Sequence, residues 1–135
     1  MSDYGEANLS LFFFTVGGVH FAADVEQAAG MAPYSGECAD DLFWFHEEFG
    51  FGKTVAYQTP VVVTIRTRDG LPYRVIIDQM EEIVEFRRDD LRLFPEILEP
   101  KVMQNGMWAV LPRHGKLVLL VDFQSLLQHS GLTVN

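Results

Sequence analysis

The sequence predicts a mostly β fold, because short apolar stretches alternate with turn signals along most of its 135 residues. Several of these stretches flank glycine-rich turns, which is typical of β-hairpins. Aromatic residues make up 13% of the chain, and 11 of them are phenylalanine, a residue that favours pleated, half-buried strands. We therefore expect one small β-barrel or a pair of barrels, with only short helices.

The first expected hairpin lies near the N-terminus. Leu9–Val16 and Val19–Ala23 are apolar stretches separated by Gly17-Gly18. A glycine pair between two such stretches predicts a two-residue turn. The short mixed stretch 24–29 ends at Gly30, and the segment 32–41, with its proline, glycine and aspartates, is expected to be a loop.

The next segment predicts a short helix over residues 42–51. Leu42, Phe45 and Phe49 are spaced i, i+3 and i+7, as on one face of a helix. One of the two aspartates at positions 40 and 41 could cap its start, and Gly50 could end it.

The clearest hairpin lies in the middle of the chain, where Val61–Arg66 and Leu71–Asp78 flank an Arg-Asp-Gly turn. Val75-Ile76-Ile77 is continuously apolar, as in a strand that is covered on both faces. The pattern continues over 80–86 with a change of phase, which predicts a bend or bulge near Gln79.

The C-terminal third predicts a second clear hairpin and a helix. Residues 87–105 contain prolines and clustered charges and are expected to be mainly loop. The segments 106–111 and 117–123 are expected to be strands around a turn at 112–115. A final helix should begin near Asp122 and end at Gly131.

The charge and cysteine content exclude several classes of protein. The net charge is −9, and an acidic surface repels the phosphates of nucleic acids. The single cysteine cannot form an internal disulfide, which is consistent with a reducing compartment. The N-terminus lacks the basic region of a signal peptide, and no apolar run approaches the ~20 residues of a membrane helix. We expect a cytoplasmic protein with no membrane insertion.

The chemical motifs in the chain are incomplete. Residues 52–54 resemble the end of a phosphate-binding loop, but Glu47 stands where that loop needs glycine. A His-Glu pair at 46–47 begins like a zinc-protease helix, but Gly50 stands where the second ligand belongs. Cys38 has acidic neighbours, which disfavour a reactive thiolate. The adjacent carboxylates of Glu81 and Glu82 should point to opposite faces of a strand. We expect no enzyme activity, no cofactor and no metal site.

Several segments of the second half follow one another in a recognisable order. Val75-Ile76-Ile77-Asp78-Gln79-Met80-Glu81-Glu82-Ile83-Val84 is followed by Asp89-Asp90-Leu91 and a proline-bearing loop. Strand segments at 106–111 and 116–122 then lead to Asp122-Phe123-Gln124-Ser125-Leu126-Leu127. In kind and order these segments resemble the CheW-like domain of bacterial chemotaxis. Its second half has an Asp-Gly-Val-x-x-Val segment, a charged loop, a β-hairpin and an Asp-x-x-x-Leu-Leu helix.

The N-terminal half resembles the same family. Phe21–Gln27 is similar to its second strand and the Val-Glu-Gln turn that follows, and residues 42–52 are similar to its Asp-Leu helix. The resemblance is strong over 61–128 and predicts a single domain over 1–135, with 1–8 as a tail. The family's Asn-Leu-Arg-Gly segment has no counterpart here, and the interval from Gly30 to Leu42 is shorter than in the family.

The resemblance implies an all-β fold of two packed, five-stranded SH3-like barrels, the first one shortened. It implies a non-catalytic, cofactor-free adaptor for the regulatory domain of a CheA-type histidine kinase, a methyl-accepting chemoreceptor, or both. The missing segment leaves a second interpretation open: a degenerate module that self-associates as a homo-oligomer or sequesters a signalling partner without coupling. A third class, a ligand-binding or enzymatic small barrel, would need an ionisable cluster in a pocket, and no sequence motif indicates one.

The resemblance also gives candidate contact residues. Asp78, Met80 and Ile83 occupy the family's Asp-Gly-Val-x-x-Val segment, which lies near the groove between the barrels, so they are candidate receptor contacts. The alternative is that Met80 and Ile83 belong to the core.

A second candidate set is the densest aromatic cluster of the chain. Trp44, Phe45 and Phe49 could cover the shortened barrel or contact a second copy of the chain. The alternative is that these aromatic side chains fill the core.

Overall fold

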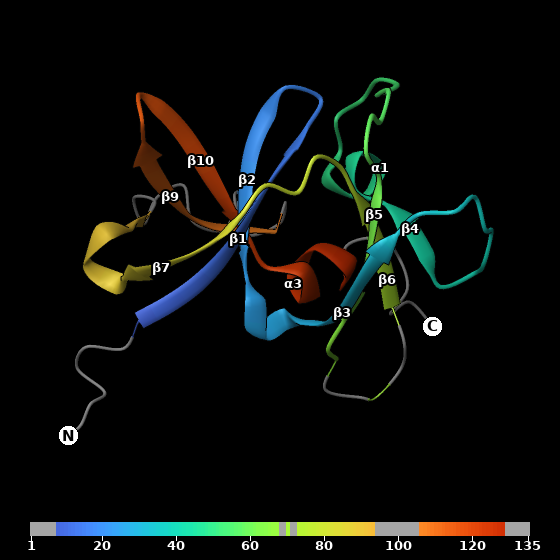
Figure 1. Cartoon of the computed structure of the whole chain (residues 1–135), viewed down its shortest axis with the longest axis horizontal. Helices are drawn as coiled ribbons and strands as arrows, with labels where there is room; N and C mark the ends of the chain where they lie inside the picture. Colours follow the sequence, from blue (N-terminus) through green and yellow to red (C-terminus); the bar gives the residue numbers. More distant parts are fainter. Residues whose placement is uncertain (1–7, 68–69, 71–72, 94–105, 129–135) are drawn as a thin grey trace.

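A computed structural model describes residues 8–67, 70, 73–93 and 106–128. Its strands form two curled sheets, with β7-β1-β2-β10-β9-β8 in the large sheet and β3-β5-β6-β4 in the small sheet. Figure 1 shows the sheets side by side, with helix α3 between them. The predicted all-β fold with two units is confirmed. In the described residues the strands divide six and four, whereas two five-stranded barrels were expected.

The large sheet combines both ends of the chain, and the small sheet comes from the middle. The strands of the large sheet are β1 Asn8–Val16, β2 Val19–Asp24, β7 Ile83–Arg87, β8 Arg92–Leu93, β9 Met107–Arg113 and β10 Lys116–Val121. Those of the small sheet are β3 Ala28–Pro33, β4 Leu42–Trp44, β5 Val61–Ile65 and β6 Tyr73–Ile77. The helices are α1 Phe45–Phe49, α3 Phe123–Gln128 and the 3₁₀ turns Val25–Gln27 and Arg88–Asp90.

The N-terminal hairpin forms as predicted. Strands β1 and β2 pair antiparallel up to Val16 and Val19. Gly17 and Gly18 both have positive φ, +59° and +83°, as a tight hairpin turn requires. A Cβ atom at Gly17 would lie 2.8 Å from a ring atom of Phe51, so the hairpin tip packs closely on the loop after α1.

The other two predicted hairpins also form. Strands β5 and β6 pair antiparallel, and Val75, Ile76 and Ile77 are all fully buried, as their continuous apolar run predicted. Part of their turn lies outside the described residues. The β9–β10 turn is shorter than expected, because β9 continues through Arg113 and only His114-Gly115 remain between the strands.

Strand β3 lies where a mixed stretch and a loop were expected. Its sequence has weak intrinsic β preference, since it contains glycine, proline and alanines. It is a strand because it pairs with β5, with an irregularity between Ala28 and Gly30. This pairing between distant segments is a tertiary effect that local composition does not reveal.

The helix expected over 42–51 is only partly confirmed. Its first three residues form β4, which pairs parallel with β6, and only 45–49 are helical. Trp44 occupies the N-cap position and makes no side-chain capping bond. Gly50, with a φ of +89°, ends the helix as predicted. Asp41 does not cap the helix, because its carboxylate is bonded to Arg74 of β6.

The bend expected near Gln79 is the point where the chain passes from the small sheet to the large sheet. Gln79 has a φ of +45°, a conformation that L residues rarely adopt. Strand β7 begins only at Ile83 and pairs with β1. We call residues 78–82, between β6 and β7, the crossover segment.

The alternation of β1 divides the core into two clusters. The inter-sheet cluster lies between the two sheets. Its buried members are Phe12, Phe14, Val16, Phe21, Ala23, Phe45, Val63, Ile65, Val75, Ile77, Val121, Phe123 and Leu126. The large-sheet cluster lies on the other face of the large sheet, and its buried members are Leu9, Leu11, Phe13, Ala22, Ala109, Leu111, Val118 and Leu120. These members come from β1 and β2 and from β10 and β9, so the two halves of the sheet curl around them.

Helix α3 begins where the sequence predicted, and a glutamine side chain holds its first turn. The backbone N–H of Gln124 donates to Asp122 Oδ1 at 3.0 Å. Gln27 Nε2 donates to the same oxygen at 3.0 Å, and Gln27 Oε1 accepts from the N–H of Phe123 at 2.9 Å. The expected end at Gly131 lies outside the described residues.

Candidate partner-binding surface

The crossover segment carries the first set of predicted contact residues, and Asp78 begins it. The Asp78 side chain is 1% exposed. Its Oδ1 accepts the N–H of Thr59 at 2.7 Å, and both oxygens lie 3.0 Å from the N–H of Gln58. Its carbonyl accepts the N–H of Thr15 at 3.2 Å. Such a side chain has no surface to offer a partner, so Asp78 anchors the loop before β5 against β1.

Met80 and Ile83 follow Asp78 along the chain, and their side chains are more exposed than that of Asp78. Met80 is half-buried and packs against the inter-sheet cluster. Ile83 is 58% exposed, so it does not belong to the core. It pairs with Phe12 in the β1–β7 ladder, and directly paired residues project from the same face of a sheet. Ile83 therefore lies on the face that carries the inter-sheet cluster. We call Met80 and Ile83 the crossover surface.

The aromatic set divides between the core and the surface. Phe45 is fully buried, with its ring centre 4.8 Å from that of Phe21, and Phe49 is 5.0 Å from the same ring. Phe45 and Phe49 therefore fill the core between the sheets, and Phe45 has no surface for a partner. Trp44 is half-buried and belongs to a separate group, 5.3 Å from Tyr34 and 4.9 Å from Tyr57.

Two further apolar side chains are exposed on the large sheet. Leu117 of β10 is 57% exposed and Val19 of β2 is 37% exposed. Strands β10 and β2 pair parallel at Leu119 and Phe21, two residues later on each strand. Because side chains alternate along a strand, Leu117 and Val19 lie on the same face as those two residues. Their exposure does not follow from the local sequence, because it depends on where the small sheet ends.

The small sheet carries polar contacts that fix the loops around Trp44. Arg74 makes a two-pronged contact with Asp41, with Nη2 at 2.9 Å and Nε at 3.1 Å from the two carboxylate oxygens. This hydrogen bond lowers the pKa of Asp41. The hydroxyl of Tyr57 accepts the backbone N–H of His46 at 3.1 Å, and burial raises the pKa of Tyr57 to about 12.

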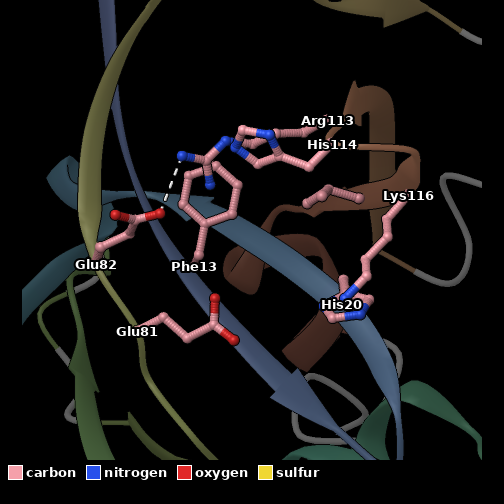
Figure 2. A pocket seen from close by; sticks show the side chains of 8 residues that line it. Phe13, His20, Glu81, Glu82, Arg113, His114 and Lys116 are labelled. Carbon is pink, nitrogen blue, oxygen red and sulfur yellow. Dashed lines mark ion pairs between the residues drawn. The ribbon is translucent and has the colours of Figure 1, made fainter.

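A pocket of about 160 Å³ opens at one end of the large-sheet cluster. It is lined by Phe13, His20, Glu81, Glu82, Arg113, His114, Lys116 and Val118. Figure 2 shows Glu81 and Glu82 on one side of the opening and His20 and Lys116 on the other. The lining comes from β1, β2, β9, β10 and the crossover segment, so it exists only once the sheet has curled.

An ion pair closes one side of this pocket. Arg113 Nη2 lies 2.9 Å from Glu82 Oε2, as the dashed line in Figure 2 marks. The guanidinium carbon of Arg113 is 4.5 Å from the ring centre of Phe13 and 5.7 Å from that of Phe86. Stacking on aromatic rings and pairing with a carboxylate together fix the Arg113 side chain.

These pocket residues were missed as a group in the sequence analysis. Glu81 and Glu82 were expected to point to opposite faces of a strand, but the crossover segment is not a strand and both residues line the pocket. The available sequence signal was the Arg113–Lys116 turn, which places two cations opposite one another in the β9–β10 ladder. Which acidic groups would face them depends on the path of the crossover segment.

The described residues hold no group of three or more His, Cys, Asp or Glu side chains that could bind a metal ion. Among the same residues, no helix has the length and apolarity that crossing a membrane would require.

Comparison with known proteins identifies the fold. No protein-family model matches the chain, and a search of curated protein sequences gives no match. Among solved structures, the scaffolding protein TtCheW from Thermoanaerobacter tengcongensis is similar, with a TM-score of 0.64 and 9% sequence identity. The alignment covers 86% of this chain and 90% of TtCheW. The chain therefore has a CheW-like fold, as its sequence pattern predicted.

Proposed function

We propose that this protein is a non-catalytic, cytoplasmic adaptor of a chemotaxis-like signalling system, formed as a single domain over the whole chain. It binds the regulatory domain of a CheA-type histidine kinase, the tip of a chemoreceptor, or both. The observation that carries the proposal is Ile83, a large apolar side chain that is 58% exposed beside the core between the two sheets. Apolar side chains exposed at such a site are typical of protein contacts.

Two further observations support this role. The fold is shared with a scaffolding protein over 86% of the chain. The crossover surface is also held firmly, because Glu81 donates its N–H to Phe13 at 2.8 Å and the N–H of Phe13 donates to Glu82 at 2.9 Å. A preorganised contact loses little conformational freedom on binding.

The predicted contact residues take different parts in this proposal. Met80 and Ile83 form the direct contact, and the half-buried Trp44 contributes from β4 of the small sheet, whereas Phe49 of α1 packs in the core. Asp78 acts through its backbone partners, because its side chain lies in the interior. Phe45 is fully buried and is not retained as a contact.

The test is titration calorimetry of the purified chain against the kinase regulatory domain and against a soluble receptor-tip fragment. Ile83→Asp should weaken binding to at least one of them by about tenfold or more, since a charge would be placed in an apolar contact. Leu117→Asp is the matched control, because Leu117 is 57% exposed and lies on a different strand. The proposal fails if neither fragment binds the folded wild-type chain, or if both variants bind as the wild type does.

A second candidate function is self-association without coupling. In the described residues β7 pairs only with β1, so the other edge of β7, next to the exposed Ile83, is unpaired. Unpaired edges are templates for pairing between copies. Size-exclusion chromatography with light scattering distinguishes the two functions. A dimer that Ile83→Asp converts to a monomer would favour self-association.

A further inference from the structure

We propose that the pocket at the open end of the large-sheet cluster binds a small zwitterion, with the ammonium and carboxylate groups of a free α-amino acid. This would be a ligand site separate from the crossover surface. The proposal rests on the distribution of charge around the pocket, on its apolar floor and on its size.

One wall of the pocket offers a cation that nothing else in the described chain uses. Lys116 lines the pocket and makes no ion pair with a described residue. His20 lies on the same side, with its Nδ1 3.3 Å from the hydroxyl of Thr15. The Lys116 ammonium is therefore available for the carboxylate of a ligand, in a protein whose net charge is −9.

The facing wall offers the carboxylate of Glu81, which is exposed and has no cationic partner among the described residues. The N–H of Glu81 is bonded to Phe13 O at 2.8 Å, so the backbone at Glu81 is fixed. Its carboxylate has only a weak contact, at 3.4 Å, with the Thr15 hydroxyl. The neighbouring Glu82 is already paired with Arg113. Glu81 is therefore the group that would accept the ammonium of a ligand.

The space between these walls suits a molecule of this kind. The floor is formed by Phe13 and Val118, both at most 4% exposed. The volume of about 160 Å³ is well above the ~10–15 Å³ that one water molecule needs, so the space can hold a small organic molecule. A small amino acid such as L-serine fits this space, with a charged group toward each wall and its short side chain toward the floor.

A purely anionic or purely cationic ligand would use only half of the site. An anion would bring a second negative charge toward Glu81, and a cation would be repelled by Lys116. A zwitterion satisfies both groups at once, and hydrogen bonds to charged groups are the strong ones. The geometry therefore predicts that a zwitterion binds more tightly than a ligand that carries only the carboxylate or only the ammonium group.

The experiment is a titration of the full chain followed by NMR, with L-serine, acetate and ethylammonium as separate probes. L-serine should bind with a Kd of about 1 mM or lower, at least about tenfold more tightly than acetate or ethylammonium. Glu81→Gln and Lys116→Met should each weaken L-serine binding by about tenfold or more. The matched controls Glu26→Gln and Lys53→Met, at exposed positions away from the pocket lining, should leave it unchanged.

The outcomes that would overturn the proposal are specific. They are absence of saturable binding up to about 50 mM L-serine, equal binding of the three probes, or ethylammonium binding best, as general attraction to an acidic surface predicts. Binding of L-serine that survives both pocket variants, or that the two control variants weaken equally, would also overturn it. Circular dichroism of each variant confirms that loss of binding is not loss of fold.

Discussion

The two apolar clusters on either side of the large sheet differ in the kind of side chain that fills them. The inter-sheet cluster is aromatic: Phe14 lies 5.6 Å from Phe21, 5.2 Å from Phe45 and 6.2 Å from Phe123. The large-sheet cluster is mainly aliphatic: among the described residues Phe13 is its one buried aromatic member, with the partly buried Phe86 and Trp108 packed against it. Strand β1 contributes alternate side chains to the two clusters.

The difference lies in how each cluster is closed. The inter-sheet cluster receives side chains from both sheets, α1 and α3, so apolar groups cover it. The large-sheet cluster is enclosed by one sheet that must curl around it, and charged side chains line the pocket at one end. Burial between two layers thus gives a closed core, whereas burial inside one curled layer leaves an opening that can be used for binding.

The largest expected effect separates the two clusters by stability. Phe14→Ala should lower the free energy of unfolding by about 3–5 kcal/mol, because it removes a ring that is 1% exposed among three others. Leu9→Ala, at the rim of the large-sheet cluster and 6% exposed, should cost about 2 kcal/mol. Urea denaturation measures both values. An equal or larger cost for Leu9→Ala would contradict the distinction between a closed and an open cluster.

The next effect concerns the segment that joins the two clusters. Asp78→Ala should destabilise the protein by about 2–3 kcal/mol, because the N–H groups of Gln58 and Thr59 would lose their buried charged acceptor. Denaturation is the measurement, and Asp78→Asn, which retains one acceptor oxygen, should cost less than the alanine variant. A neutral Asp78→Ala would mean that water replaces the carboxylate and that Asp78 is not an anchor.

A smaller effect tests the ion pair at the open end. Arg113→Ala should cost about 1–2 kcal/mol, because the guanidinium of this largely buried side chain stacks on Phe13 and Phe86. Glu82→Ala should cost at most about 0.5 kcal/mol, since its side chain is 50% exposed. Chemical denaturation of the two variants side by side tests this order. The reverse order would show that the charge pair, and not stacking, closes the pocket.

The smallest effect comes from the comparable ion pair on the small sheet. The pKa of Asp41 is lowered in the folded protein by its hydrogen bond to Arg74, from an ordinary value of 3.8. A lowered carboxyl pKa adds stability that is complete above the unfolded value and is lost as the pH falls through the folded value. Asp41→Asn should therefore lower the melting temperature slightly at pH 7, and the difference from wild type should vanish in acid. A difference that persists at low pH would assign the effect to packing.

Elements whose local pattern agrees with their final environment could be predicted from the sequence. The Gly17-Gly18 turn, the buried run Val75–Ile77 and the start of α3 at Asp122 each follow from a short signal. Strand β3 and strand β4 could not be predicted in the same way. Both are short, and they are strands because β5 and β6 supply the neighbouring backbone.

The candidate sites were also only partly predictable from the sequence. Their position along the chain, in the segment around residues 78–83, came from the resemblance in sequence order and stays a prediction. Exposure within that segment did not follow from the sequence, because Asp78 and Ile83 differ by their placement on either side of the Gln79 bend. The pocket was missed because its lining residues are distant in sequence and meet only across the curled sheet.

The sequence by itself determined that this protein is a mostly β domain with a CheW-like order of strands, since hairpins and apolar alternation are local properties of the chain. The tertiary structure decided which of those side chains are exposed, which fill the core and which line a pocket. The physical reason is that exposure depends on how two sheets pack and how one of them curls, and both depend on contacts between residues far apart in the sequence.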